Sequence, residues 1–243
     1  MTGHEVLRDA GGRVVADYTV VFSGGENRAE HVRAADGVPD ADVAAALRRE
    51  LPGWEVSASE GVGLALVAAG AVKVRHMHCY TWDLATRGVD PGWLDPQLPP
   101  GLSAVPAVDR EAADLTAAWL SAYPPGHPDN PAGETFDSAR AQLATLYDGT
   151  LIGALMPCGV VIQDGPRPVA ACLANDRPGT PPLGGPWVTE VFRDPDPAYA
   201  GLGATALRLT LARAHAAGTP ALGLTVTEGN PARRTYEKLG FTH

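Results

Sequence analysis

The chain of 243 residues is long enough to bury a full core, as one large domain or as two smaller ones. Its net charge of −9 argues against a nucleic-acid partner, because proteins that track phosphates gather cationic side chains to displace counterions. The longest apolar run, 62–72, is well short of the roughly 20 residues that a membrane crossing requires, so no membrane partner is expected.

Two further features bear on the compartment. The first thirty residues lack an apolar stretch beside a basic start, which is not the pattern of a secretory signal peptide. The three cysteines, Cys79, Cys158 and Cys172, have no metal-type spacing and cannot all pair within one chain. Both features favour a reducing compartment, and the cytoplasm is the expected location.

Strand and helix patterns alternate over the N-terminal part of the chain. They predict an extended segment at 12–22, a helix at 40–51, a strand at 54–58, a helix at 60–69 and a long strand at 72–84. This β-α-β-α-β order predicts a small α/β unit over residues 1–85. The next segment, 86–101, is rich in Pro and Gly without an apolar period, which predicts a linker between two domains.

His76 and His78 share one face of the long predicted strand, because alternate residues of a strand point the same way. Two imidazoles on one face can contribute to a metal site. The sequence places no third ligand beside them, and polar strand faces are common. No metal site is therefore predicted.

From residue 102 the alternation restarts and predicts a second, larger domain over 102–243. The patterns indicate a strand at 102–108, a helix capped by Asp109, a loop at 124–131, a helix at 135–146, a hairpin of strands at 151–163 and 168–174, a strand at 187–193, a helix at 203–217, a strand at 221–227 and a short helix after Asn230. His127 and Asp129 in the loop are candidates to line an acceptor pocket, although loops commonly carry such residues.

Gly201 and Gly203 stand at the predicted start of the 203–217 helix. The first N–H groups of a helix lack backbone partners and carry partial positive charge, so glycines that let a ligand approach the backbone make a natural diphosphate site. An ordinary tight turn before a helix also explains both glycines.

A dinucleotide-binding fingerprint competes for the same segment, because residues 201–206 formally match G-x-G-x-x-A. That fingerprint expects an acidic residue about 20 positions later to hold the ribose. Residues 198–227 contain no Asp or Glu, so a hydride-transferring oxidoreductase is the weaker hypothesis. A Walker loop is excluded, because no Gly-Lys-Ser/Thr follows the glycines.

The segment from Pro186 to Phe241 resembles the cofactor half of the GNAT superfamily of acyl-CoA-dependent N-acetyltransferases. Members usually carry Val-x-Pro-x-x-Arg/Gln-Gly-x-Gly-x-Gly/Ala where this chain has 193–203; the Pro and the two later glycines match, whereas Ala198 and Tyr199 replace the Arg/Gln and the first Gly. The ending, from Asn230 through Tyr-Glu-Lys-Leu-Gly-Phe, is similar to the family's Asn, helix and Tyr-Glu-x-x-Gly-Phe. The element order extends the resemblance over 102–185, and the N-terminal unit is weakly similar to the last half of a second, degenerate GNAT unit.

The resemblance implies an α/β fold of the α+β, mixed-sheet kind, acetyl-CoA as co-substrate, and a primary amine of a small molecule or peptide as acceptor. It implies that the backbone of the 191–193 strand holds the pantetheine arm, that amides from the loop and helix start cradle the diphosphate, and that an Asn contacts the cofactor. In this sequence these residues are Val191, Phe192, Arg193, Tyr199, Ala200, Gly201, Leu202, Gly203, Ala204 and Asn230. A homodimer is one assembly compatible with this interpretation.

The resemblance also implies the roles in chemistry. Tyr236 is the expected general acid, because a phenol of pKa about 10 can protonate a thiolate whose conjugate acid has a pKa near 8.5 only modestly uphill. Glu190 is the nearest candidate base, with Glu228 behind it, and a water chain is an alternative. Each of these residues also has an explanation that requires no role in catalysis or cofactor binding. Tyr236 can be a core aromatic, Glu190 a solvated charge on a strand, and Asn230 a helix cap.

Two departures from the family pattern support an alternative function. Ala198 and Tyr199 stand where the family has cradle residues, and the predicted 221–227 strand carries no acid, so a non-catalytic acyl-CoA-binding or regulatory module is the alternative to an enzyme. Members of the family also continue past Gly-Phe with more strand. We expect residues 72–84 to fill that sheet edge, or the chain to be shortened.

Overall fold

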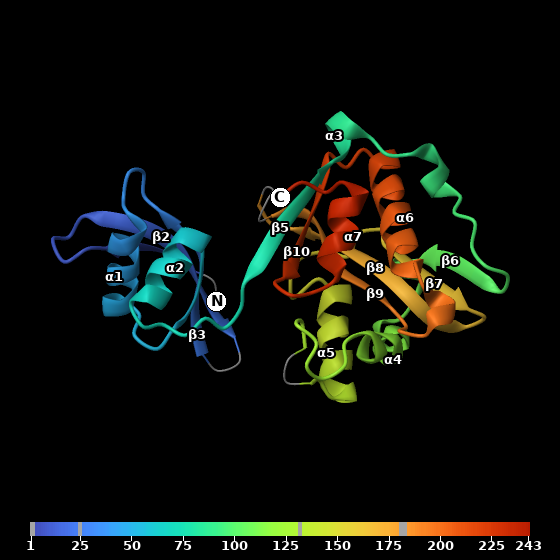
Figure 1. The fold of residues 1–243 in the computed structure, drawn as a ribbon, viewed down its shortest axis with the longest axis horizontal. Coiled ribbons are helices and arrows are strands. Elements are labelled where there is room, and N and C mark those ends of the chain that lie inside the picture. Colours follow the sequence, from blue (N-terminus) through green and yellow to red (C-terminus); the bar gives the residue numbers. More distant parts are fainter. Residues whose placement is uncertain (1–2, 24–25, 131–132, 180–183) are drawn as a thin grey trace. The chain divides into compact units, whose positions relative to one another are not determined.

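The computed structural model of the chain describes residues 3–23, 26–130, 133–179 and 184–243, and it divides into two compact units, residues 1–75 and 76–243 (Figure 1). The division falls earlier than the sequence predicts, because strand β5 (Met77–Asp83), predicted to end the first unit, belongs to the sheet of the second. Among the described residues, no helix combines the length and the apolar character needed to span a bilayer.

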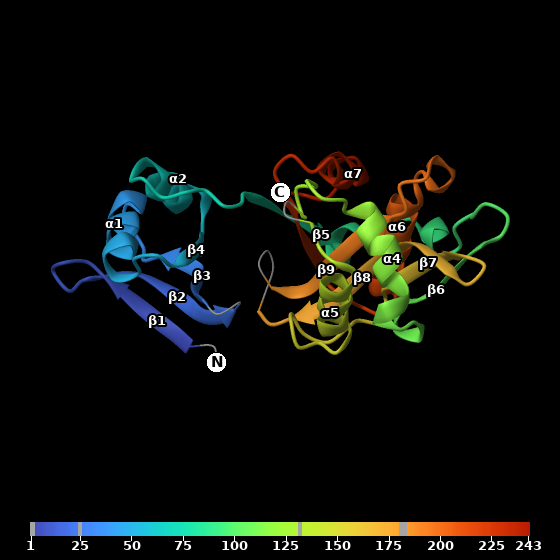
Figure 2. The same cartoon turned by 90° about the horizontal axis from the view of Figure 1, so that it is seen from below.

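The first unit is a four-stranded sheet with two helices packed on one face (Figures 1 and 2). In sheet order the strands are β1 (Gly3–Arg8), β2 (Val14–Ser23), β3 (Glu26–Ala34) and β4 (Glu55–Ala58), and the helices are α1 (Asp40–Glu50) and α2 (Glu60–Ala68). The structure adds β1 and β3 to the predicted elements. Sequence patterns missed them because both are rich in charged side chains; β1 buries only Leu7.

The second unit is built on a six-stranded sheet in the order β5-β10-β9-β8-β7-β6. Its other strands are β6 (Leu102–Pro106), β7 (Val160–Asp164), β8 (Arg167–Arg177), β9 (Gly185–Arg193) and β10 (Ala221–Thr227). All neighbours are antiparallel except β9 and β10, which are parallel. The strand predicted over 151–163 forms only as β7, because Gly153 has a φ of 132° and packs so tightly that a Cβ there would lie 2.1 Å from the Asp176 carbonyl oxygen.

Helices cover both faces of this sheet. On one face lie α6 (Leu202–Ala216), α7 (Ala232–Leu239) and the single turn α3 (Leu84–Arg87); on the other lie α4 (Ala112–Ala122) and α5 (Phe136–Tyr147). Short 3-10 turns occupy Pro91–Leu94, Ala107–Asp109 and Pro197–Tyr199. The helix predicted from Asp109 begins at Ala112, whereas Thr135 caps α5 through a capping box with Ser138.

Strand β5 occupies the sheet edge that the sequence analysis assigned to residues 72–84. It pairs with β10 along its whole length, from Met77 opposite Thr227 to Asp83 opposite Ala221. Tyr80 and Trp82 anchor it, since their alternate positions place both rings in the core. The Pro-rich segment 86–101, predicted to be a linker, packs onto the same core through Val89, Trp93 and Leu98.

The parallel strands β9 and β10 touch at one point near their starts. Gly223 opposite Trp187 is the one residue pair between them in the described part of the chain, and beyond it the strands part toward their carboxyl ends. A bulge at Thr189 accompanies this, because Leu173 pairs with Glu190 while Ala174 pairs with Val188. The outcome is a sheet that opens between its two parallel strands.

Gly223→Ala is expected to destabilise the second unit, because a Cβ at this crossing would lie 2.5 Å from ring atoms of the buried Trp187. Overpacking of this kind typically costs about 1–3 kcal/mol, which chemical denaturation would measure. Gly203→Ala is the control, since its Cβ would meet Val191 at 3.9 Å and alanine favours a helix. Equal stability of Gly223→Ala and the parent chain would contradict the tight crossing.

Candidate active site

The loop before α6 leaves four consecutive backbone N–H groups without a partner. Gly201, at a φ of 86°, makes the turn into the helix, and the first N–H to bond within it is that of Thr205, which donates to the Gly201 carbonyl at 3.1 Å. Among the described residues, nothing accepts from the N–H groups of 201–204. A Cβ on Gly201 would meet no atom within 4 Å, so a ligand can approach the backbone.

The upstream part of the predicted cradle is closed by its own hydrogen bonds. The N–H of Tyr199 donates to the Asp196 carbonyl at 3.0 Å, and that of Ala200 donates to the Pro197 carbonyl at 3.1 Å. These two amides are therefore engaged within the loop, and the diphosphate role predicted for them stays a prediction. The contacts predicted for Gly201, Leu202, Gly203 and Ala204 also stay predictions.

The side chains of the loop before α6 bind other parts of the protein. Backbone groups therefore remain at the helix start to contact a ligand. The Tyr199 hydroxyl donates to Asp164 at 2.8 Å and accepts from Arg167 at 2.7 Å, which turns the ring onto the sheet. The Arg193 guanidinium donates to the Asp194 carbonyl at 2.7 Å. Binding of an anion here would thus rest on backbone amides and the helix dipole.

The end of α4 reaches the open edge of β9. Tyr123, the residue after α4, donates its hydroxyl hydrogen bond to the Val191 carbonyl at 3.0 Å, and its ring packs against Phe192. A pantetheine arm that used the Val191 carbonyl would have to displace this phenol. Sequence reasoning missed Tyr123, because a tyrosine at the end of an amphipathic helix reads as a core aromatic.

Tyr236 lies on α7 with 7 % of its surface exposed, and its ring packs edge-on against Phe241. Burial raises the pKa of the Tyr236 phenol well above its ordinary value, and nearby Cys172, Asp129 and Glu190 raise it further. The hydroxyl therefore keeps its proton at any ordinary pH, as a general acid must before it acts.

Two phenols and two carboxylates share this neighbourhood. Burial raises the pKa of Tyr123 well above its usual range, followed by the effects of Glu190, Tyr236 and Asp129. These effects on the two pKa values indicate that the four groups lie near one another at the opening between β9 and β10. They come from the end of α4, from β9, from α7 and from the loop after α4. Of the four, the sequence predicted Glu190 and Tyr236 as chemical groups and Asp129 as a pocket candidate.

Asp129 fastens the loop after α4 to the end of β10. Its carboxylate accepts hydrogen bonds from the Thr227 hydroxyl and from the Asn230 side-chain amide, and the buried Asn130 donates to the Tyr123 carbonyl at 2.7 Å. Asn230 also accepts from the Ala232 N–H at 2.8 Å, which is the predicted capping role. Both ends of its side chain are engaged within the protein, and the predicted cofactor contact stays a prediction.

Two surface grooves lie away from this site. One of about 340 Å³ runs between α4 and α5, and one of about 580 Å³ runs between α1 and α2; both are lined largely by alanines. Glu228, the second candidate base, also lies outside the cluster, because it contacts His78 and Arg233 instead.

Solved structures of GCN5-related N-acetyltransferases share this fold. One from Sphaerobacter thermophilus aligns at 15% identity and a TM-score of 0.61, over 98% of this chain and 76% of that one. A tandem GNAT protein from the clavulanic acid biosynthesis pathway aligns at 17% and 0.59, over 99% and 79%, and a protein from Kribbella flavida at 20% and 0.53, over 98% and 86%. No family model and no curated protein matches the sequence. The predicted GNAT-like fold is confirmed, and the tandem protein fits the two-unit description.

Proposed function

We propose that this protein is an N-acetyltransferase that moves an acetyl group from acetyl-CoA to a primary amine of a small molecule or peptide. One observation carries the proposal: in the described part of the chain β9 and β10 form one residue pair, Trp187 with Gly223, and then part, beside a helix start with four unpaired amides. An open strand edge suits an extended amide-bearing arm, and the helix start suits its diphosphate. In the first unit, the parallel strands β3 and β4 pair at several positions, from Arg28 opposite Glu55 to Val32 opposite Ala58.

The chemistry would use groups that the opening already gathers. The amine nitrogen attacks the thioester carbonyl carbon and gives up a proton to Glu190, while a backbone N–H of β9 stabilises the oxyanion. The carbon–sulfur bond then breaks, and the thiolate takes the phenolic proton of Tyr236. Glu190 is assigned as the base because it lies on β9 and raises the pKa values of both Tyr123 and Tyr236.

Glu190→Gln is expected to lower kcat about a hundredfold near neutral pH, at the lower end of what a general base contributes, with acetyl-CoA affinity unchanged. The loss should shrink as pH rises, because the amine then loses its proton to solvent. Steady-state kinetics across pH would measure this against Asp129→Asn, which should act mainly on the KM of the amine. A pH-independent loss in Glu190→Gln would remove Glu190 as the base.

The proposal is tested by calorimetric titration with acetyl-CoA, followed by a thiol-release assay over a panel of primary amines. We expect one binding event and thiol release with at least one amine, with cationic amines favoured because the chain carries a net charge of −9. Failure to bind acetyl-CoA would overturn the proposal at its first step.

A non-catalytic acyl-CoA-binding module is the second candidate. It is favoured by the burial of Tyr236 and by the carboxylates Asp194 and Asp196, which precede a cradle that has Ala198 in the family's Arg/Gln position. Acetyl-CoA binding without thiol release across the amine panel would support this alternative and contradict the enzyme.

A further inference from the structure

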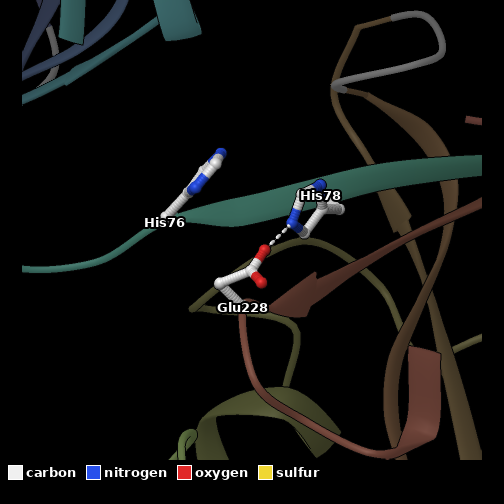
Figure 3. Close-up of side chains that lie close together, drawn as sticks. All are labelled: His76, His78 and Glu228. Carbon is white, nitrogen blue, oxygen red and sulfur yellow. Dashed lines mark hydrogen bonds and ion pairs between the residues drawn. The ribbon is translucent and has the colours of Figure 1, made fainter. Parts of the chain in front are cut away.

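Three side chains able to bind a metal converge where β5 begins and β10 ends (Figure 3). His76 immediately precedes β5, His78 lies within it, and Glu228 immediately follows β10. One ligand atom from each lies within 4.8 Å of the other two, and the Glu228 carboxylate contacts His78 directly. The backbone N–H of Glu228 donates to the His76 carbonyl at 2.8 Å, which fixes the two segments against each other.

We propose that His76, His78 and Glu228 form a binding site for a Zn²⁺ ion. Two neutral imidazoles and one carboxylate are a set that zinc accepts, with water in the fourth position, whereas Ca²⁺ and Mg²⁺ prefer oxygen ligands alone. Zinc bonds of about 2.0–2.1 Å place tetrahedral donor atoms about 3.4 Å apart, so the widest pair has to move closer and the directly contacting atoms of His78 and Glu228 have to separate. Rotation of His76, which is only partly buried and lies ahead of the strand, can supply that movement.

A third histidine, His243, supports the assignment through its contact with His78. His243 places its Nε2 atom 3.3 Å from the Nδ1 atom of His78, with ring centroids 5.4 Å apart. Metal-binding histidines commonly donate their other ring N–H to an acceptor, which fixes the tautomer and aims the remaining lone pair at the metal. With Nδ1 donating to His243, the Nε2 lone pair of His78 faces the Glu228 carboxylate, and a cation between them is favoured.

A guanidinium already lies beside this position. Arg233 places Nη1 3.2 Å from His78 Nε2 and 3.6 Å from the Glu228 carboxylate. Its Nε atom donates to the Tyr80 hydroxyl at 3.0 Å and to Glu237 at 2.9 Å, and because the guanidinium is rigid and planar, moving Nη1 aside disturbs these two hydrogen bonds. Arg233 is therefore expected to compete with the metal, and its removal should strengthen metal binding.

The test is calorimetric titration of the full chain with Zn²⁺, after treatment with a chelator and without acetyl-CoA, so that it is independent of the proposed function. We expect one saturable site, weakened at least tenfold by His78→Ala and by the isosteric Glu228→Gln, and weakened less by His243→Gln. Arg233→Ala should raise the affinity. His4→Ala and His215→Ala are matched controls that should leave binding unchanged, and circular dichroism of each variant checks folding.

Cobalt substitution gives a second readout. Co²⁺ bound to His76, His78 and Glu228 should show visible bands of nitrogen and oxygen ligation without a thiolate charge-transfer band, because Cys79 lies on the opposite face of β5 from His78. A thiolate band would overturn the ligand set. Absence of saturable Zn²⁺ uptake, or uptake that survives both His78→Ala and Glu228→Gln in folded protein, would overturn the site.

Discussion

Tyr236→Phe is expected to lower kcat about a thousandfold, within the range of about 10²–10⁴ that general acid–base catalysis contributes. The substitution removes only the hydroxyl that would protonate the departing thiolate. Acetyl-CoA affinity, measured by calorimetry, should stay within twofold, because the ring and its packing against Phe241 remain.

The pH profile sharpens this experiment. Burial raises the pKa of Tyr236, so under the proposed function the parent chain should hold its rate above pH 10, where an ordinary tyrosine loses its proton. Tyr147→Phe is the matched control: Tyr147 is a partly buried phenol on α5 that donates to the Ala107 carbonyl at 3.2 Å, away from the opening. Equal turnover in Tyr236→Phe and the parent chain would exclude the phenol from the proposed mechanism.

Ala204→Asp should weaken acetyl-CoA binding at least tenfold, or about 1.4 kcal/mol, while slightly stabilising the fold. Ala204 lies in the first turn of α6, where a carboxylate interacts favourably with the helix dipole but repels a bound diphosphate. Opposite effects on affinity and stability separate a binding defect from unfolding. Calorimetry and thermal denaturation measure the two.

Ala204→Asn is the control for this substitution, because it matches Asp in size and lacks the charge. It should bind acetyl-CoA nearly as the parent chain does, and the deficit of Ala204→Asp should shrink at high salt through screening. Equal affinities for the Asp and Asn variants would place the diphosphate elsewhere.

The sequence predicted best where function depends on a local pattern. Gly201 and Gly203 mark the start of α6, and the run from Tyr236 to Phe241 marks the end of α7. Both helix ends could therefore be predicted from the local sequence. Strand β10 appeared at its predicted bounds, because its apolar residues are framed by Pro220 and Gly229.

Contacts between segments far apart in the sequence could not be predicted from it. Glu228 and His78 are 150 residues apart and Asn230 and Asp129 are 101 apart, so no local pattern relates them. Tyr123 gained significance only when α4 packed beneath β9. The domain boundary failed for the same reason, since a strand's partner depends on tertiary packing and its own sequence does not record it.

The place of β5 governs how the larger unit can be separated for study. A fragment cut at the Pro-Gly segment, beginning at Leu102, would lose β5 and bare the hydrogen-bonding edge of β10 along with the apolar surface that Tyr80 and Trp82 cover. Such an unprotected edge invites intermolecular strand addition and aggregation. Truncation ahead of His76 keeps this sheet whole. It retains β5, which pairs with β10, and β10 forms one side of the opening beside β9.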